Sequence, residues 1–121
     1  MMFRHVQGFQ ADMDRLQEHL QAAILSEDMR EMVREGGAAQ ALGDNLIAGL
    51  TELSATSAGE ESERTFLNAA RGSLVAAVNA AQRVALGTNA TEVRAALLLL
   101  KTHADYADAY LKGAAGFQAD S

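Results

Sequence analysis

Proline, cysteine and tryptophan are all absent from the 121 residues of this chain. Because proline lacks an amide donor and its ring clashes with the preceding turn, its absence permits long, uninterrupted helices. The absence of cysteine excludes disulfides, thiol nucleophiles, zinc–thiolate sites and iron–sulfur clusters. Only 5% of the residues are aromatic although 49% are hydrophobic, so we expect a core of aliphatic side chains and alanine.

Net charge and chain length limit which partners and how many domains we expect. The formal net charge is −6, and an acidic surface repels phosphate, so we expect no nucleic-acid partner. The longest apolar run, Ala95–Leu100, is far shorter than the roughly 20 residues of a membrane span, so we expect no membrane partner. Residues 1–5 show no secretory signal, although a processed signal would leave no trace. We therefore expect one domain, residues 1–121, in the cytoplasm.

The first third of the chain predicts a helix from about Phe3 to Leu25. Ser26 is typical of a helix cap, and the apolar spacing resumes after it and continues to Glu35, so either a bend or a break at Ser26 fits. Two adjacent glycines, Gly36-Gly37, predict a firm stop. The apolar seam of the first helix has alternating spacings of three and four: Val6, Phe9, Met13, Leu16, Leu20 and Ala23.

The middle of the chain predicts two further helices. One spans about Ala38 to Leu53 and is followed by a loop at Ser54–Gly59; the next runs from Glu60 to Leu86. Ser57 and Glu60 have the spacing of a capping box. The third helix has a clean seam formed by Leu67, Ala70, Leu74, Ala77, Ala81 and Val84.

The last helix begins after Gly87, where Asn89 and Glu92 again have capping-box spacing. We expect it to fray from Gly113 to Gly116. Four helices with short connections predict an all-α fold, an antiparallel up-down-up-down four-helix bundle. The seam of the last helix consists of Val93, Leu97, Leu100, Ala104, Ala107 and Leu111.

An uncharged stretch of the third helix indicates an interface. No charged residue occurs from Gly72 to Gln82, and a helix that is small or apolar on nearly every side is expected to be buried on more than one. The two interpretations are that a second copy covers this surface in a homodimer, or that the bundle core buries it all. The residues assigned to the interface are Gly72, Ser73, Ala76, Asn79, Ala80, Leu98 and Leu99.

Two tyrosines extend the candidate interface. Tyr106 and Tyr110 lie one turn apart on the last helix, with His103 one turn before them. Tyrosine supplies contact area and a hydrogen bond together, so this ridge is typical of a contact hot spot. The alternative is that the ridge packs on the first helix with its hydroxyls at the rim.

The residues needed for catalysis or for a metal site do not form a recognisable pattern. No serine has the glycine-framed setting of a nucleophile, and no glycine-rich phosphate loop occurs, so we predict no enzyme activity. Di-metal bundles use Glu-x-x-His, but Met2, Leu16 and Leu100 occupy the position three residues before the histidines. We therefore predict no metal and no resident cofactor.

Two short patches resemble the soluble cytochrome b562 family: Asp12–Leu16 near the start of the chain and Leu100–His103 near its end. The resemblance implies a four-helix bundle that holds haem between a methionine of the first helix and a histidine of the last, here Met13 and His103. The family's histidine lies nearer the C-terminus, and aligning the Lys-Thr pair places Asp108 there. In the competing interpretation Met13 fills the core and His103 is a flanking polar residue.

These observations predict a non-catalytic protein–protein interaction module such as a small adaptor, a regulator or a secretion-type chaperone. The predicted mechanism is burial of an alanine- and leucine-rich helix face, with acidic rims for selectivity. A cofactor-binding bundle is the alternative, and the sequence does not identify the partner.

Overall fold

The computed structural model describes residues 2–56 and 61–119, with side chains described for 8–53 and 61–114. No strand occurs among these residues, which confirms the predicted all-α class. The four helices are α1 (Met2–Leu25), α2 (Met29–Thr56), α3 (Glu61–Leu86) and α4 (Ala90–Ala119).

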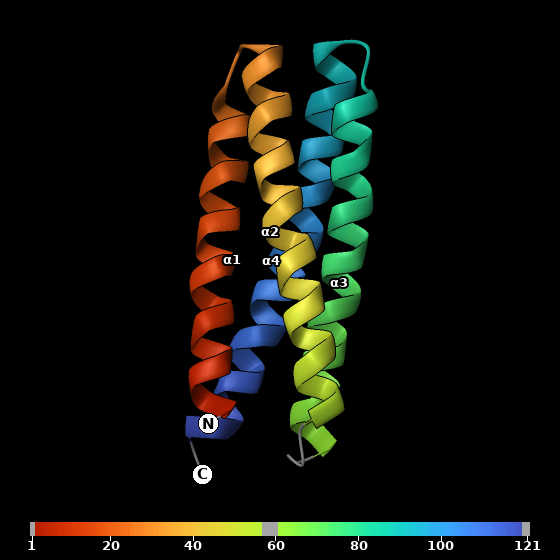
Figure 1. Cartoon of the computed structure of the whole chain (residues 1–121). Coiled ribbons are helices and arrows are strands. Elements are labelled where there is room, and N and C mark those ends of the chain that lie inside the picture. Colours follow the sequence, from red (N-terminus) through yellow and green to blue (C-terminus); the bar gives the residue numbers. More distant parts are fainter. Residues whose placement is uncertain (1, 57–60, 120–121) are drawn as a thin grey trace.

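The helices form an antiparallel bundle in which each one packs against its neighbours in sequence (Figure 1). The α1–α2 and α3–α4 connections lie at one end of the bundle, and the two chain termini lie at the other. α4 also packs against α1 and closes the ring, and the most extensive contact joins α3 and α4. Among the described residues α1 and α3 make no contact, so they occupy diagonal positions. The up-down-up-down four-helix bundle is thus confirmed.

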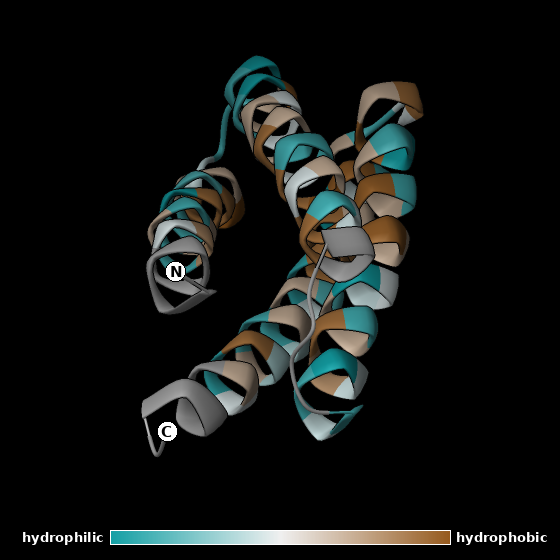
Figure 2. Ribbon diagram, turned by 60° about the horizontal axis from the view of Figure 1, so that its bottom comes forward, coloured by the Kyte–Doolittle hydropathy of each residue, from teal (hydrophilic) through white to brown (hydrophobic). Residues whose placement is uncertain are grey.

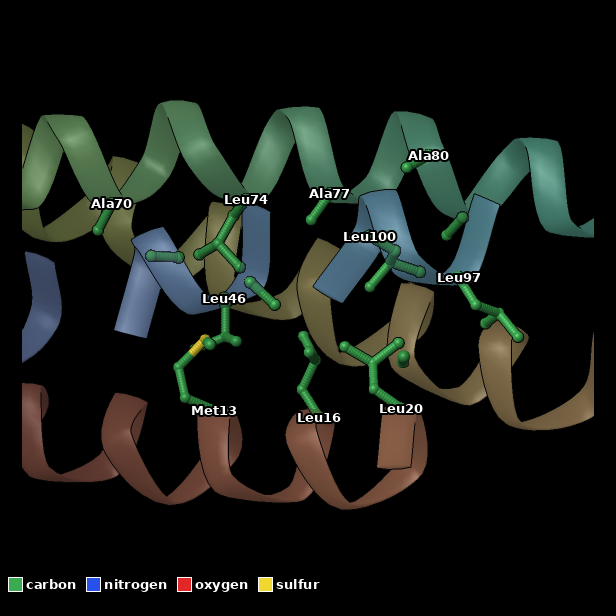
Figure 3. Packing of buried hydrophobic residues seen from close by; sticks show 14 of the residues in the cluster. Met13, Leu16, Leu20, Leu46, Ala70, Leu74, Ala77, Ala80, Leu97 and Leu100 are labelled. Atoms are coloured by element: carbon green, nitrogen blue, oxygen red, sulfur yellow. The ribbon is translucent and has the colours of Figure 1, made fainter. Parts of the chain in front are cut away.

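The core follows the predicted seams closely. On α3 and α4 every predicted seam residue is buried, and on α1 the described seam residues from Met13 onward are buried as well. Met13, Leu16 and Leu20 point from α1 into the interior, towards side chains of α2, α3 and α4 (Figure 3). Small alanines alternate with leucines on α3 and α4, which explains how these two helices come so close together.

The prediction of a helix stop at Gly36-Gly37 is wrong, because α2 runs straight through both glycines. The reason is that Gly36 and Gly43 belong to the buried seam of α2, where they lie against Val84 and Val78 of α3. The cost of glycine, about 1 kcal/mol each in a helix, is offset by this close packing. The whole seam has spacings of four and three: Met32, Gly36, Ala39, Gly43, Leu46, Leu50 and Leu53.

The true break between α1 and α2 lies at residues 26–28. The Arg30 N–H donates to the Asp28 carboxylate (2.9 Å), and the Asp28 N–H donates to Ser26 Oγ (3.0 Å). Asp28 is therefore the N-cap of α2, and Ser26 supports it from upstream. The sequence analysis placed the cap at Ser26, two residues before Asp28, because serine and aspartate are both common N-cap residues.

The start of α4 forms the predicted cap with one difference. The Glu92 N–H donates to Asn89 Oδ1 (2.9 Å), as expected, but the Glu92 carboxylate reaches back to Thr88 rather than to Asn89. At the other end α4 continues through Gly113 to Ala119, so the expected fraying at Gly113 is wrong. Phe66 of α3 packs against Gly113, which explains why the helix persists there. The proposed Ser57–Glu60 capping box lies outside the described residues.

The expectation that α3 is too apolar to face water is also corrected. Four of its alanines, Ala70, Ala77, Ala80 and Ala81, are buried against the neighbouring helices, and hydrophobic ribbon segments lie between the helices (Figure 2). What remains exposed on α3 is mostly polar or small, with two large apolar exceptions: Val75 at 43% exposure and, at the end of the helix, Leu86 at 78%. Its other exposed middle residues are Asn68, Gly72, Asn79 and Gln82.

Candidate functional site

The exposed apolar surface that the sequence assigned mainly to α3 lies chiefly on α4. Among the described residues, three of the six large hydrophobic side chains that remain exposed are Leu98 (51%), Leu99 (39%) and Tyr106 (56%) of α4. They follow one another along the helix side that points away from the core. The exposed smaller residues between and around them are Ala95, Thr102 and Ala109.

α3 borders this surface along one side. The rings of Phe66 and Tyr110 lie 6.4 Å apart, and Arg83 and Leu99 line one depression, so these stretches of α3 and α4 run side by side. Helical periodicity places the small residues of the uncharged stretch, Gly72, Ser73 and Ala76, on the side of α3 that adjoins α4. We name the combined surface the α3–α4 face: Gly72, Ser73, Ala76 and Asn79 of α3 with Ala95, Leu98, Leu99, Thr102, Tyr106 and Ala109 of α4.

A depression of about 390 Å³ marks one end of the α3–α4 face, beside the α3–α4 connection. Leu86, Ala95, Ala96 and Leu99 give it an apolar lining, with Arg83, Gly87 and Glu92 at the edge. Leu86 is 78% exposed beside it. An apolar hollow with a few polar groups is the usual form of a binding site.

One predicted interface residue is buried, and another lies at the edge of the α3–α4 face. Ala80 is buried in the core (2% exposed), because the tight contact of α3 with α4 covers it. Leu98 is exposed and forms the edge of the face nearest α1, one turn after Arg94 and one turn before Lys101. The other predicted residues lie on the adjoining sides of α3 and α4, and their role as an interface stays a prediction.

The two tyrosines of the predicted ridge have different environments. Tyr106 is 56% exposed and projects from the α3–α4 face. Tyr110 is half-buried and packs against Phe66, so its neighbour is α3 and not the first helix, as one interpretation had it. Of the two, Tyr106 therefore offers the larger exposed surface to a partner.

The charges around the depression are arranged unevenly. The Thr88 N–H and hydroxyl both donate to Glu92 Oε2, each at 3.0 Å, and these bonds lower the pKa of Glu92 below its ordinary value. Arg83, in contrast, forms no ion pair or side-chain hydrogen bond with any part of the chain that the structure describes. The Glu92 carboxylate is thus hydrogen-bonded within the α4 cap, whereas the Arg83 guanidinium is available to a partner.

The opposite border of the face, between α4 and α1, is polar and closed by hydrogen bonds. Gln10 donates to Asp108 (2.6 Å) and Gln17 donates to Asp105 (3.0 Å). Lys101 donates to Gln17 (3.0 Å) and also pairs with Asp105 (2.7 Å). Because these groups already satisfy one another, this border is better suited to frame the face than to bind through it.

The structure places Met13 of α1 in the core and His103 on the side of α4 that faces α3. Met13 is fully buried beside Leu46 (Figure 3). His103 is half-buried and follows Leu99 by one turn, on the stripe that faces α3. α1 instead meets α4 through Lys101 and Asp105. The two side chains therefore do not converge on a shared space in this packing.

Other kinds of site find little support in the described ranges. Within residues 8–53 and 61–114, no three histidine, aspartate or glutamate side chains are grouped to hold a metal ion. The interior space beside Gly43 and Val78 is too small for a water molecule. No helix segment in the described ranges is both long and apolar enough to cross a membrane.

The sequence analysis missed the depression and its Arg83. Leu86 and Arg83 lie off the buried seam near the end of α3, and both were left unassigned. The sequence signal that could have indicated them is Leu86, a leucine that lies off the predicted seam directly before the Gly87 stop. The sequence alone does not show how α3 and α4 are aligned along their length, and this alignment is what places Arg83 and Leu86 beside Leu99.

Comparison with known proteins adds no family. No family model, no curated protein and no solved structure matches this chain. A functional conclusion must therefore come from the geometry described above.

Proposed function

We propose that this protein is a non-catalytic interaction module, and that its α3–α4 face packs against a second copy of the chain. The observation that supports the proposal is the row of exposed Leu98, Leu99 and Tyr106 on one side of α4. Because each of these side chains is already about half buried in the single chain, covering the rest of one contributes about 1 kcal/mol, and a two-fold dimer buries each of them twice.

The composition of the face agrees with this role. Interface cores are depleted of charge, and the α3–α4 face has no charged residue at its centre and carries one exposed aromatic side chain, Tyr106. Small residues at Gly72, Ser73 and Ala76 permit a second helix to approach closely. The polar border along α1 would limit the contact to one side.

A charge placed in the face tests the proposal. We expect Leu99→Glu and Ala76→Glu each to shift the protein from dimer to monomer in light scattering, because each puts a carboxylate into an apolar contact that would have to be desolvated. In Leu99→Glu, pairing of the new carboxylate with Arg83 would also take that guanidinium away from the partner. Helix content measured by circular dichroism should stay unchanged, since Leu99 and Ala76 are partly exposed in the single chain.

The matched control is Ala48→Glu, which places the same charge on the exposed side of α2. This variant should keep the wild-type mass. If Leu99→Glu and Ala76→Glu also keep it, or if the wild type is itself a monomer, the proposal fails.

A further inference from the structure

The α3–α4 face carries both a projecting side chain and a hollow. Tyr106 projects with 56% of its surface exposed. The depression of about 390 Å³ beside Leu99 has room for one aromatic side chain. A surface with both features can bind a second copy of itself.

We infer that Tyr106 of each copy inserts into the depression beside Arg83 of the other copy, in a two-fold antiparallel pairing of α4 with α4. This inference rests on the proposed function and specifies its partner geometry. It assigns Tyr106 and Arg83 as the anchors of the dimer.

The spacing along α4 fits such a pairing. Tyr106 and Leu99 are separated by about two turns, or about 10 Å. A two-fold axis perpendicular to α4, passing beside Thr102, brings Tyr106 to the level of Leu98 in the other copy, at the Leu99 end of the depression. Such an axis also keeps the α3 side of one copy over the α3 side of the other. Tyr106 lies towards α3, as the depression does, so it arrives over the opening.

The residue at the axis tolerates burial. Thr102 donates its hydroxyl hydrogen to the Leu98 carbonyl (3.0 Å), so its donor is already satisfied when two copies meet there. Its small side chain permits close approach of the two helices. No charged side chain opposes its own copy at this point, since Lys101 is held by Gln17 on the α1 border.

The chemistry of the hollow suits tyrosine. Its lining of Leu86, Ala95 and Leu99 matches the ring, and Arg83, which no described side chain engages, can lie over the ring face or donate to the hydroxyl. Tyrosine and arginine are the residue types that most often anchor interfaces. At the other end of the contact, Gly72 leaves space for the incoming Arg83.

The test is a complementation experiment between two variants. Tyr106→Ala removes the projection and keeps the hollow, whereas Ala95→Phe fills the hollow and keeps the projection. Each variant alone loses both contacts of the dimer, so its dissociation constant should rise on the order of 100-fold. Mixed together, the two should form a heterodimer that regains one contact and binds about tenfold more tightly than either alone. Both positions are exposed in the single chain, and Ala41→Phe on α2 is the control for an added surface ring.

Three results would overturn the inference. If Tyr106→Ala dimerises like the wild type while Leu99→Glu is monomeric, the pairing is wrong but the proposed face stands. If both variants weaken the dimer but mixing restores nothing, the reciprocal insertion is wrong. If the wild type stays monomeric at every concentration, both this inference and the proposed function fail.

Discussion

Individual glycines determine how closely α2 can approach its neighbours. A Cβ at position 43 would lie 2.9 Å from Val78 Cγ2, and a Cβ at position 49 would lie 2.6 Å from the ring of Phe9. Gly37, one residue after the buried Gly36, has nothing within 4 Å. Glycine is therefore required at positions 43 and 49 of α2, whereas at position 37 it lowers helix stability with no gain in packing.

Alanine substitutions separate the two cases. Gly37→Ala should stabilise the fold by about 0.5–1 kcal/mol, because alanine loses less entropy in a helix and meets no neighbour. Gly43→Ala should instead destabilise it by about 1 kcal/mol, because the stiff Val78 side chain must give way. Urea unfolding at fixed protein concentration measures both.

A double variant identifies the cause. Adding Val78→Ala removes the methyl group that a Cβ at position 43 would meet, so Gly43→Ala should become stabilising in that background. A loss of the same size in both backgrounds would show that the contact with Val78 does not explain the need for glycine.

At the scale of helices, capping and seam spacing define most boundaries. The seams of α3 and α4 were predicted residue by residue, since heptad spacing identifies a buried stripe without knowledge of its neighbours. The stop predicted at Gly36 was wrong, because glycine indicates either a helix end or a close contact, and only the partner helix distinguishes them. The cap at the start of α4 was predicted because its spacing is local.

The α4 cap makes stability depend on pH. The Thr88 hydrogen bonds lower the pKa of Glu92, so the unfolded chain binds the proton more readily than the folded one. The stabilisation is present above the ordinary glutamate pKa and is lost as the pH falls through the lower, folded-state value. The melting temperature of Glu92→Gln should lie below that of the wild type at about pH 6, and the gap should narrow by about pH 3.

Thermal melts of the wild type and Glu92→Gln at matched concentration measure this gap. Glu61→Gln, at an exposed position in the first turn of α3, controls for the loss of one surface carboxylate. A gap that is equally wide at both pH values would exclude the Thr88–Glu92 contact as its source.

At the scale of the whole molecule, the arrangement of helices decides which apolar residues remain exposed. The sequence identified an excess of small and apolar residues on its third and fourth helices but assigned it mainly to the third. The contact between α3 and α4 buries Ala77, Ala80 and Ala81, and leaves Leu99 and Tyr106 of α4 outside. Such an assignment requires the register between helices, which spacing within one helix does not contain.

Nuclear magnetic resonance of the unmodified protein across a dilution series tests self-association through the α3–α4 face most directly. Backbone amide shifts should change with concentration at Gly72, Leu98, Leu99 and Tyr106, while the exposed side of α2 around Ala48 stays constant. Shifts that do not depend on concentration, or changes confined to α1 and α2, would contradict the assignment of this face.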